Sequence, residues 1–279
     1  MRIDAHQHFW RYEPEEYAWI SEPLAALRRD FLPEDLQPLL AAHGIDGCVA
    51  VQARQTVAES DWLLELADAS RIVRGVVGWV DLRDPGAEAE LARLAAHPRF
   101  VGVRHIAQDE PDDGFLARPD FVAGVAKLAP HGLRYDLLVY ERQLPAAIEL
   151  VSALPGQPFV LDHLGKPCIA DGMREPWAGN LVELARRENV QCKVSGLVTE
   201  AAWDAWTLHA LRQYLDTALE AFGPGRLMFG SDWPVCLLAG DYPAVYELVE
   251  HWSAALSTAE RAALFGGNAA RFYGLTRED

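Results

Sequence analysis

The sequence predicts a single (β/α)8 barrel, and two observations support that prediction. Eight short apolar runs alternate with longer amphipathic stretches, and the runs recur at intervals of about 32 residues, the size of one βαβ unit. The chain has 279 residues, close to the length that such barrels use in one piece. A doubly wound open sheet is the alternative, but no G-x-G-x-x-G motif follows the first predicted strand.

The predicted strands are nearly continuous in Val, Ile, Leu and Phe, as strands buried on both faces are. They cover Arg2–His6, Gly47–Gln52, Val73–Val80, Phe100–Arg104, Leu133–Val139, Pro158–Asp162, Val190–Val194 and Arg226–Phe229. One helix is predicted from Pro33 to His43, because Gly44 ends it, and another is predicted to end over Ala126–His131, before Gly132. Further helices are predicted over Val57–Ala69, Glu88–Ala96, Glu141–Leu154, Leu181–Glu188, Ala201–Phe222 and Tyr242–Ala255. No linker interrupts this series, so one domain over residues 1–279 is expected.

Composition limits the partners. The chain carries 25 Lys and Arg against 41 Asp and Glu, a net charge of −16, which repels nucleic acid and anionic membrane. No apolar run approaches the roughly 20 residues of a membrane span. The four cysteines form no C-x-x-C pair, and a strand begins at residue 2, which leaves no room for a signal peptide. We therefore expect a cytoplasmic protein that acts on a small molecule. The sequence leaves a homo-oligomer open.

The longest irregular stretch is Phe9–Phe31, which contains Trp10, Tyr12, Tyr17 and Trp19. Loops of this length in compact domains are usually functional. The stretch is either a lid or pocket wall, or an aromatic plug that only packs against the barrel.

Reactive groups in such barrels lie at the carboxyl ends of the strands. Strand one ends in Asp4-Ala5-His6-Gln7-His8, where the period of two places Asp4, His6 and His8 on one face. Strand six ends at His163, and strand eight is followed by Asp232. His-x-His alone is a weak metal signal, but His6, His8, His163 and Asp232 come from three strands that end at one mouth.

Asp232 has two interpretations. An Asp after a strand can be a helix N-cap, but Trp233 and Pro234 follow it, which is not typical of the immediate start of a helix. A carboxylate near several imidazoles can instead hold and deprotonate a water molecule. We therefore predict that Asp232 is catalytic.

Cations also lie on the predicted strands. Arg104 and His105 end strand four, and only one of them can point inward. Lys193 shares a face of strand seven with Ser195. Because buried cations need partners, Lys193 and Arg104 either pair with Asp4, Asp136 or Asp162, or bind a substrate oxygen.

Four motifs resemble the amidohydrolase superfamily and, within it, the amidohydrolase-2 branch of sugar-lactone hydrolases, the L-fuconolactonase and L-rhamnonolactonase group. The motifs are Ile3–Trp10, Leu161–Pro167, Phe229–Pro234 and Gly267–Tyr273. The resemblance covers nearly the whole chain. It implies a (β/α)8 barrel that opens a sugar-lactone ring with water.

The resemblance also implies a division of roles. Asp232 would activate water, and His6, His8, His163 or Arg104 would stabilise the oxyanion. The predicted substrate-binding residues are Arg104, Gln52, Lys193, Ser195, Trp233 and Trp10. The rival functions are a zinc-dependent decarboxylase on the same barrel and a non-catalytic protein that binds sugar acids.

The superfamily's two-metal members need a bridging ligand after strand four and a His after strand five. Here Arg104 and His105 end strand four, and strand five has no His. The resemblance therefore implies that no metal is required, although a single divalent ion such as Zn²⁺ could be held by His6, His8 and Asp232, with His163 as a further ligand.

Overall fold

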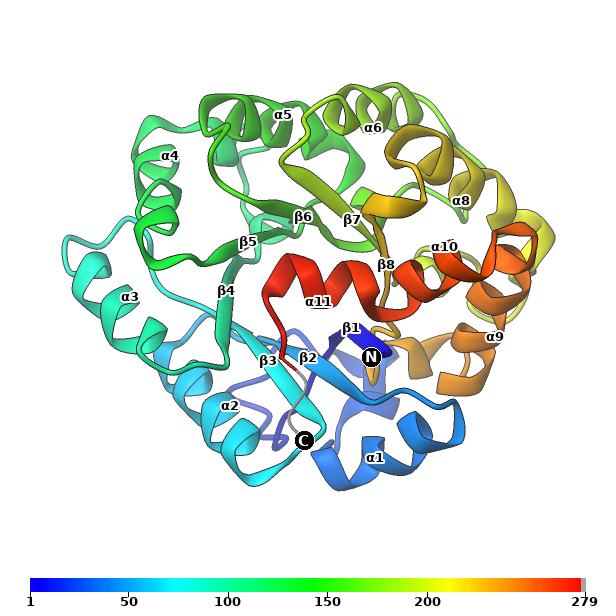
Figure 1. The fold of residues 1–279 in the computed structure, drawn as a ribbon, viewed down its shortest axis with the longest axis horizontal. Coiled ribbons are helices and arrows are strands. Elements are labelled where there is room, and N and C mark those ends of the chain that lie inside the picture. Colours follow the sequence, from blue (N-terminus) through cyan, green and yellow to red (C-terminus); the bar gives the residue numbers. More distant parts are fainter. Residues whose placement is uncertain (277–279) are drawn as a thin grey trace.

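The computed structural model describes residues 1–276 as eight parallel strands, each paired with the next in sequence order (Figure 1). The strands are β1 (Ile3–Gln7), β2 (Gly47–Val51), β3 (Val73–Gly78), β4 (Phe100–His105), β5 (Arg134–Leu137), β6 (Phe159–Leu161), β7 (Val190–Val194) and β8 (Leu227–Phe229). The ring closes where the backbone N–H of Asp232 donates to His6 (2.8 Å) and that of His8 donates to Trp233 (2.7 Å). The predicted barrel is confirmed, and the open sheet is wrong.

Helices surround the ring (Figure 1). They are α1 (Pro33–Ala42), α2 (Val57–Ala69), α3 (Ala87–Ala95), α4 (Pro119–Val125), α5 (Leu144–Ala153), α6 (Trp177–Ala185), α7 (Leu197–Glu200), α8 (Leu208–Phe222), α9 (Tyr242–Trp252), α10 (Thr258–Ala262) and α11 (Asn268–Tyr273). Across residues 1–276, none of them is long and apolar enough to cross a bilayer.

Two helix predictions need correction. The helix predicted over Ala201–Phe222 begins only at Leu208, because the Thr207 hydroxyl accepts the N–H of Ala210 and caps it there. The helix predicted to end over Ala126–His131 ends at Val125, and a separate 3-10 turn then leads to Gly132 in a left-handed conformation. In both regions the residues are helix formers, but a local cap or turn sets the boundary.

Helix α11 was not predicted, and it closes the mouth at which the strands begin. It lies across the centre of the ring in Figure 1. Its Phe272 and Tyr273 pack with Ile3, Val49 and Met228 in the barrel interior. The Tyr273 hydroxyl lies 2.9 Å from a carboxylate oxygen of Asp136 on β5 and donates to it. The interior is therefore filled from the mouth at which the strands begin, which we call the lower mouth. Only the opposite mouth, where the strands end and which we call the upper mouth, is open for chemistry.

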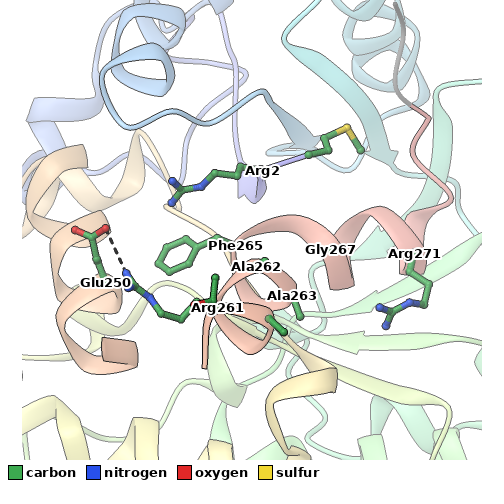
Figure 2. A pocket seen from close by; sticks show the side chains of 11 residues that line it. Arg2, Glu250, Arg261, Ala262, Ala263, Phe265, Gly267 and Arg271 are labelled. Carbon is green, nitrogen blue, oxygen red and sulfur yellow. Dashed lines mark hydrogen bonds and ion pairs between the residues drawn. The ribbon is translucent and has the colours of Figure 1, made fainter. Parts of the chain in front are cut away.

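A cavity of about 620 Å³ lies beside this lower mouth, between β1, α9 and α10 (Figure 2). The Arg2 guanidinium donates to the Tyr246 hydroxyl (2.6 Å), which donates to Glu250 (3.1 Å). Arg261 also pairs with Glu250, at 3.5 Å. These contacts join the start of β1 to α9 and α10.

The loop over Phe9–Phe31 combines its two predicted roles. Trp10 is fully buried, and its ring packs against Tyr17 and Phe31. Trp19 packs edge-on against Trp10 but is 39% exposed and lines the upper cavity. The loop is a plug at its base and a pocket wall at its tip.

Candidate active site

Three imidazoles converge on one carboxylate at the upper mouth. His6 and His8 end β1, His163 follows β6 and Asp232 follows β8. The distances from Asp232 Oδ1 to the Nε2 atoms of His8, His6 and His163 are 3.4, 3.8 and 3.9 Å. All four residues are buried, with exposed fractions of at most 4%. The structure brings together the four residues that the sequence singled out.

The backbone at this mouth adopts an unusual conformation. Asp232 has a φ of 57°, and His163, Leu164 and Lys166 have φ values of 53°, 54° and 47°. The left-handed region costs a residue with a Cβ roughly 1–2 kcal/mol. Strained backbone conformations of this kind cluster at sites where the side chain has a function. The carboxylate of Asp232 caps no helix among residues 1–276, so the N-cap interpretation is wrong.

Two glycines give the imidazoles their space. A Cβ on Gly196, which follows β7 with a φ of 65°, would lie 2.5 Å from His163 Nδ1. A Cβ on Gly230 would lie 2.7 Å from the Cβ of His6. Both distances are far below van der Waals contact, so only glycine fits at these positions.

Contacts on the far side of each ring fix its orientation. His8 Nδ1 lies 2.7 Å from the carbonyl oxygen of Val51, so it carries a proton and donates there. His163 Nδ1 lies 2.9 Å from the Ser195 hydroxyl. A hydroxyl can donate or accept, so Ser195 can support either tautomer of His163. The sequence predicted Ser195 as a substrate contact, but its hydroxyl instead holds His163.

Burial keeps two of the three imidazoles neutral. It lowers the pKa of His6 and of His163 well below the usual range. Burial by itself raises the pKa of Asp232, but the adjacent His163, the hydrogen bond from His8 and the Lys166 ammonium outweigh it, and the pKa lies below its ordinary value. Asp232 is therefore ionised at neutral pH, as a general base must be.

Beneath this cluster lies a network of buried charges. Lys193 Nζ is fully buried, 2.6 Å from Asp136, 3.0 Å from Asp162 and 3.0 Å from His6 Nδ1. Burial raises the pKa of Asp136 to about 6 although Lys193 opposes this. Lys193 was predicted to contact substrate; the structure instead has the ion pair that the sequence left open, and Lys193 does not line the cavity.

Arg104, not His105, points into the barrel. Its guanidinium donates to Asp162 at 3.1 Å and to the Gln52 amide oxygen at 3.1 Å, and it lies 3.2 Å from His6 Nε2. His105 faces away, where it contacts Glu110 at 2.7 Å. Most donors of Arg104 are therefore used within the protein, and Gln52 positions Arg104 instead of facing the cavity.

The upper cavity measures about 310 Å³ and is smaller than the lower one. Of the predicted substrate contacts only Arg104 lines it, since Gln52, Lys193, Ser195, Trp233 and Trp10 lie behind its wall. The sequence anticipated Trp19 through the stretch Phe9–Phe31 but missed several other lining residues in loops and 3-10 turns: Leu24, Gln108, Asp109, Tyr140, Lys166 and Val235. The motif Leu161–Pro167 contained the one available signal, Lys166.

The donor set fits one divalent metal ion. His6, His8 and Asp232 place their ligand atoms within 4.8 Å of one another, and His6, Asp162 and His163 do the same. Ligand atoms around a tetrahedral zinc ion lie about 3.4 Å apart, close to the His8–Asp232 distance of 3.4 Å. The lone pair of His6 faces Arg104, however. Both sets share His6, so a metal ion would have to compete with Arg104 for that lone pair.

A carboxylate that meets three imidazoles at the carboxyl-end mouth of a closed eight-stranded barrel is an arrangement typical of (β/α)8-barrel hydrolases. The chain belongs to the amidohydrolase family, whose model matches residues 3–275.

Among characterised relatives, L-fucono-1,5-lactonase of Burkholderia multivorans is 47% identical over 99% of this chain and 96% of its own length. The L-fucono-1,5-lactonase of Burkholderia ambifaria is 41% identical over the same shares. Two crystal structures of an amidohydrolase from B. multivorans, one with bound HEPES and one with bound zinc, are 47% identical and superpose with TM-scores of 0.95 and 0.94. They cover 99% of this chain and all of their own.

Proposed function

We propose that this protein opens the ring of L-fucono-1,5-lactone or a closely related aldonolactone with water. The proposal rests on one observation above all: the convergence of His6, His8 and His163 on the Asp232 carboxylate. The near-complete coverage of two L-fucono-1,5-lactonases supports the same reaction.

Asp232 acts as the general base. Its ionised carboxylate takes a proton from water, and the water oxygen bonds to the lactone carbonyl carbon. His163 can donate from Nε2 to the resulting oxyanion when the Ser195 hydroxyl donates to Nδ1. A single such donor typically contributes about 3–4 kcal/mol of barrier lowering.

The ring then opens. The bond between the carbonyl carbon and the ring oxygen breaks, and the proton on Asp232 passes to that oxygen. The product is the open hydroxy acid, and Asp232 is again ionised. Because the same carboxylate accepts and returns the proton, no other acid is needed.

We propose further that turnover requires no metal. When bound, a divalent ion would polarise the carbonyl and acidify water. The bridging ligand and the β5 His of a two-metal site are missing among residues 1–276, since β4 presents Arg104 and the β5 carboxylate Asp136 is held by Lys193 and Tyr273. The base and an oxyanion donor are present in the chain itself.

The cavity favours a neutral sugar lactone over a dicarboxylate. Arg104 is occupied by Asp162 and Gln52, and Asp109 adds an acid to the lining. The net charge of −16 also disfavours anions at long range. A second carboxylate would therefore lack a bidentate partner.

The four free cysteines fit the cytoplasmic location that we propose.

A turnover screen tests this function. The purified protein is mixed with a panel of aldonolactones and with 2-pyrone-4,6-dicarboxylate, and acid release is followed with a pH indicator. We expect L-fucono-1,5-lactone to have a kcat/KM at least about tenfold above that of the dicarboxylate, which corresponds to about 1.4 kcal/mol. Equal or faster turnover of the dicarboxylate would overturn the substrate, and no turnover of any lactone would overturn the reaction.

A further inference from the structure

The upper cavity has two walls of different chemistry. The loops after β8 and β1 contribute Val235, Trp19 and Leu24, which we call the apolar wall. The loops after β4, β5 and β6 contribute the apolar Ile106 and Leu138 and four polar residues, Gln108, Asp109, Tyr140 and Lys166, which we call the polar wall. Because the strands follow one another around a closed ring, these two sets of loops lie on opposite sides of the mouth.

On the polar wall, Lys166 is the cation with donors to spare. Its ammonium forms one ion pair, 3.3 Å from Glu200, and lies 5.3 Å from the centre of the Tyr140 ring. The side chain is 17% exposed. An ammonium has three N–H donors, whereas Arg104, the other cation lining the cavity, is held by Asp162 and Gln52.

Gln108 offers the complementary group. Its side-chain oxygen is buried, and it accepts no hydrogen bond from residues 1–276. A buried acceptor without a donor is costly, and the cost is recovered when a ligand supplies the donor. Its backbone N–H donates to Leu138 at 3.1 Å, which fixes the residue at the cavity edge.

Lys166 lies in the same cavity as Asp232 but does not contact its carboxylate. Asp232 and Lys166 both line the cavity, yet no ion pair within 4 Å joins them in the described part of the chain. Lys166 follows β6, at the end of a left-handed segment that also contains His163. A lactone carbonyl placed at Asp232 therefore leaves the rest of the ring to face the polar wall.

We infer that Lys166 and Gln108 are specificity-determining residues that bind the ring hydroxyl groups of the lactone. Lys166 donates to one hydroxyl oxygen, and Gln108 accepts from a hydroxyl. The apolar wall packs against the face of the ring that carries the deoxy methyl. This inference rests on the proposed sugar-lactone hydrolysis and names how that site selects its substrate.

The test compares two lactones that differ only in the hydroxyl groups. L-fucono-1,5-lactone carries the six-membered ring, the methyl and the hydroxyls, whereas 6-methyl-tetrahydropyran-2-one carries only the ring and the methyl. The variants are Lys166→Met, Lys166→Gln and Gln108→Leu. The matched control is Lys127→Met, since Lys127 follows α4, does not line the cavity, and among residues 1–276 donates only to the Leu82 carbonyl, at 3.5 Å.

For Lys166→Met we expect kcat/KM on the sugar lactone to fall ten- to a hundredfold, as for a hydrogen bond to a charged group. The value on the methyl lactone should fall by much less, because Lys166 affects that reaction only through its minor contribution to the pKa of Asp232. Gln108→Leu should lose about tenfold on the sugar lactone alone, because one acceptor is removed. Lys166→Gln keeps a donor and should recover part of the loss. Lys127→Met should match the wild type on both lactones.

Two outcomes would overturn the inference. If both lactones lose activity in parallel, Lys166 serves the reaction or the fold; if neither changes, it does not touch substrate. Failure of the proposed function looks different, because the wild type itself would then leave L-fucono-1,5-lactone intact. Thermal unfolding of each variant, together with Lys166→Gln, separates lost specificity from lost structure.

Discussion

The larger of the two cavities does not lie at the mouth that holds the candidate active site. The lower cavity is the larger, about 620 Å³ against 310 Å³. Its charged groups are partly exposed and joined through Tyr246 in one chain, Arg2–Tyr246–Glu250–Arg261. Figure 2 shows the last link, between Glu250 and Arg261. The upper cavity holds an ionised carboxylate and three imidazoles, all buried. Chemistry therefore follows the buried polar groups and not the volume.

Backbone conformation shows the same contrast. At the lower mouth the unusual φ of 153° belongs to Gly266, where a Cβ would lie 2.5 Å from the backbone nitrogen of Ile3. At the upper mouth the left-handed backbone positions are occupied by Asp232, His163 and Lys166, which are not glycines. The lower mouth uses glycine where the chain must turn, whereas the upper mouth retains functional side chains despite the strain.

Replacing the base should have the largest effect. Asp232→Asn keeps the shape of the side chain but cannot accept the proton, so kcat for lactone hydrolysis should fall at least about a hundredfold. Binding should change little, which a product-inhibition constant would check. Turnover near the wild-type value would rule out Asp232 as the base.

The charge network below the site should come next. Lys193→Met leaves Asp136 and Asp162 buried without their ammonium partner, and the free energy of unfolding should fall by about 3–5 kcal/mol. Chemical denaturation measures this loss, with Lys127→Met as the control. An unchanged stability would mean that Arg104 and Tyr273 suffice for both carboxylates.

The loss in Lys193→Met should also depend on pH. Burial already raises the pKa of Asp136 to about 6 against Lys193, and removing Lys193 raises it further. A native state with a raised carboxyl pKa binds more protons than the unfolded state, so its stability falls as pH rises from about 4 through that pKa. The variant should therefore be closer to the wild type at pH 5 than at pH 8.

The period of the strands explains why the four residues at the floor of the cavity could be predicted. Strand ends in a barrel meet at one mouth, so His6, His8, His163 and Asp232 could be placed together from the sequence. The choice between Arg104 and His105, and the partner of Lys193, depended on which strands become neighbours. That information appears only in the assembled barrel.

The cavity walls could not be predicted in the same way. Gln108, Tyr140 and Lys166 lie in loops, where no period indicates which side chain faces inward. Trp10, the last residue of the first motif, was predicted to bind substrate, but it is fully buried and Trp19 lines the cavity instead. Aromatic content marked the loop correctly, while the loop's own fold decided which ring is available.

Removing metal should have a small effect. Asp232 is ionised without a metal and His163 can donate to the oxyanion, so kcat/KM after exhaustive chelation should stay within about twofold of the untreated protein. Metal analysis before and after treatment is the control. If activity disappears and added zinc restores it, Lewis-acid catalysis replaces the proposed metal-free reaction.

The smallest effect should come from the lower mouth. Arg261→Ala removes a cation from the larger cavity, but its pair with Glu250 is 3.5 Å long, and the two side chains are 36% and 40% exposed. Pairs of this kind contribute about 0–1 kcal/mol to stability. We expect kcat/KM on L-fucono-1,5-lactone to remain within twofold, in contrast to the ten- to hundredfold loss in Lys166→Met. Lactone hydrolysis and thermal unfolding, measured on both variants together, check this. A comparable loss of activity in Arg261→Ala with unchanged stability would show that the lower mouth is coupled to catalysis, and the functional contrast between the two mouths would fail.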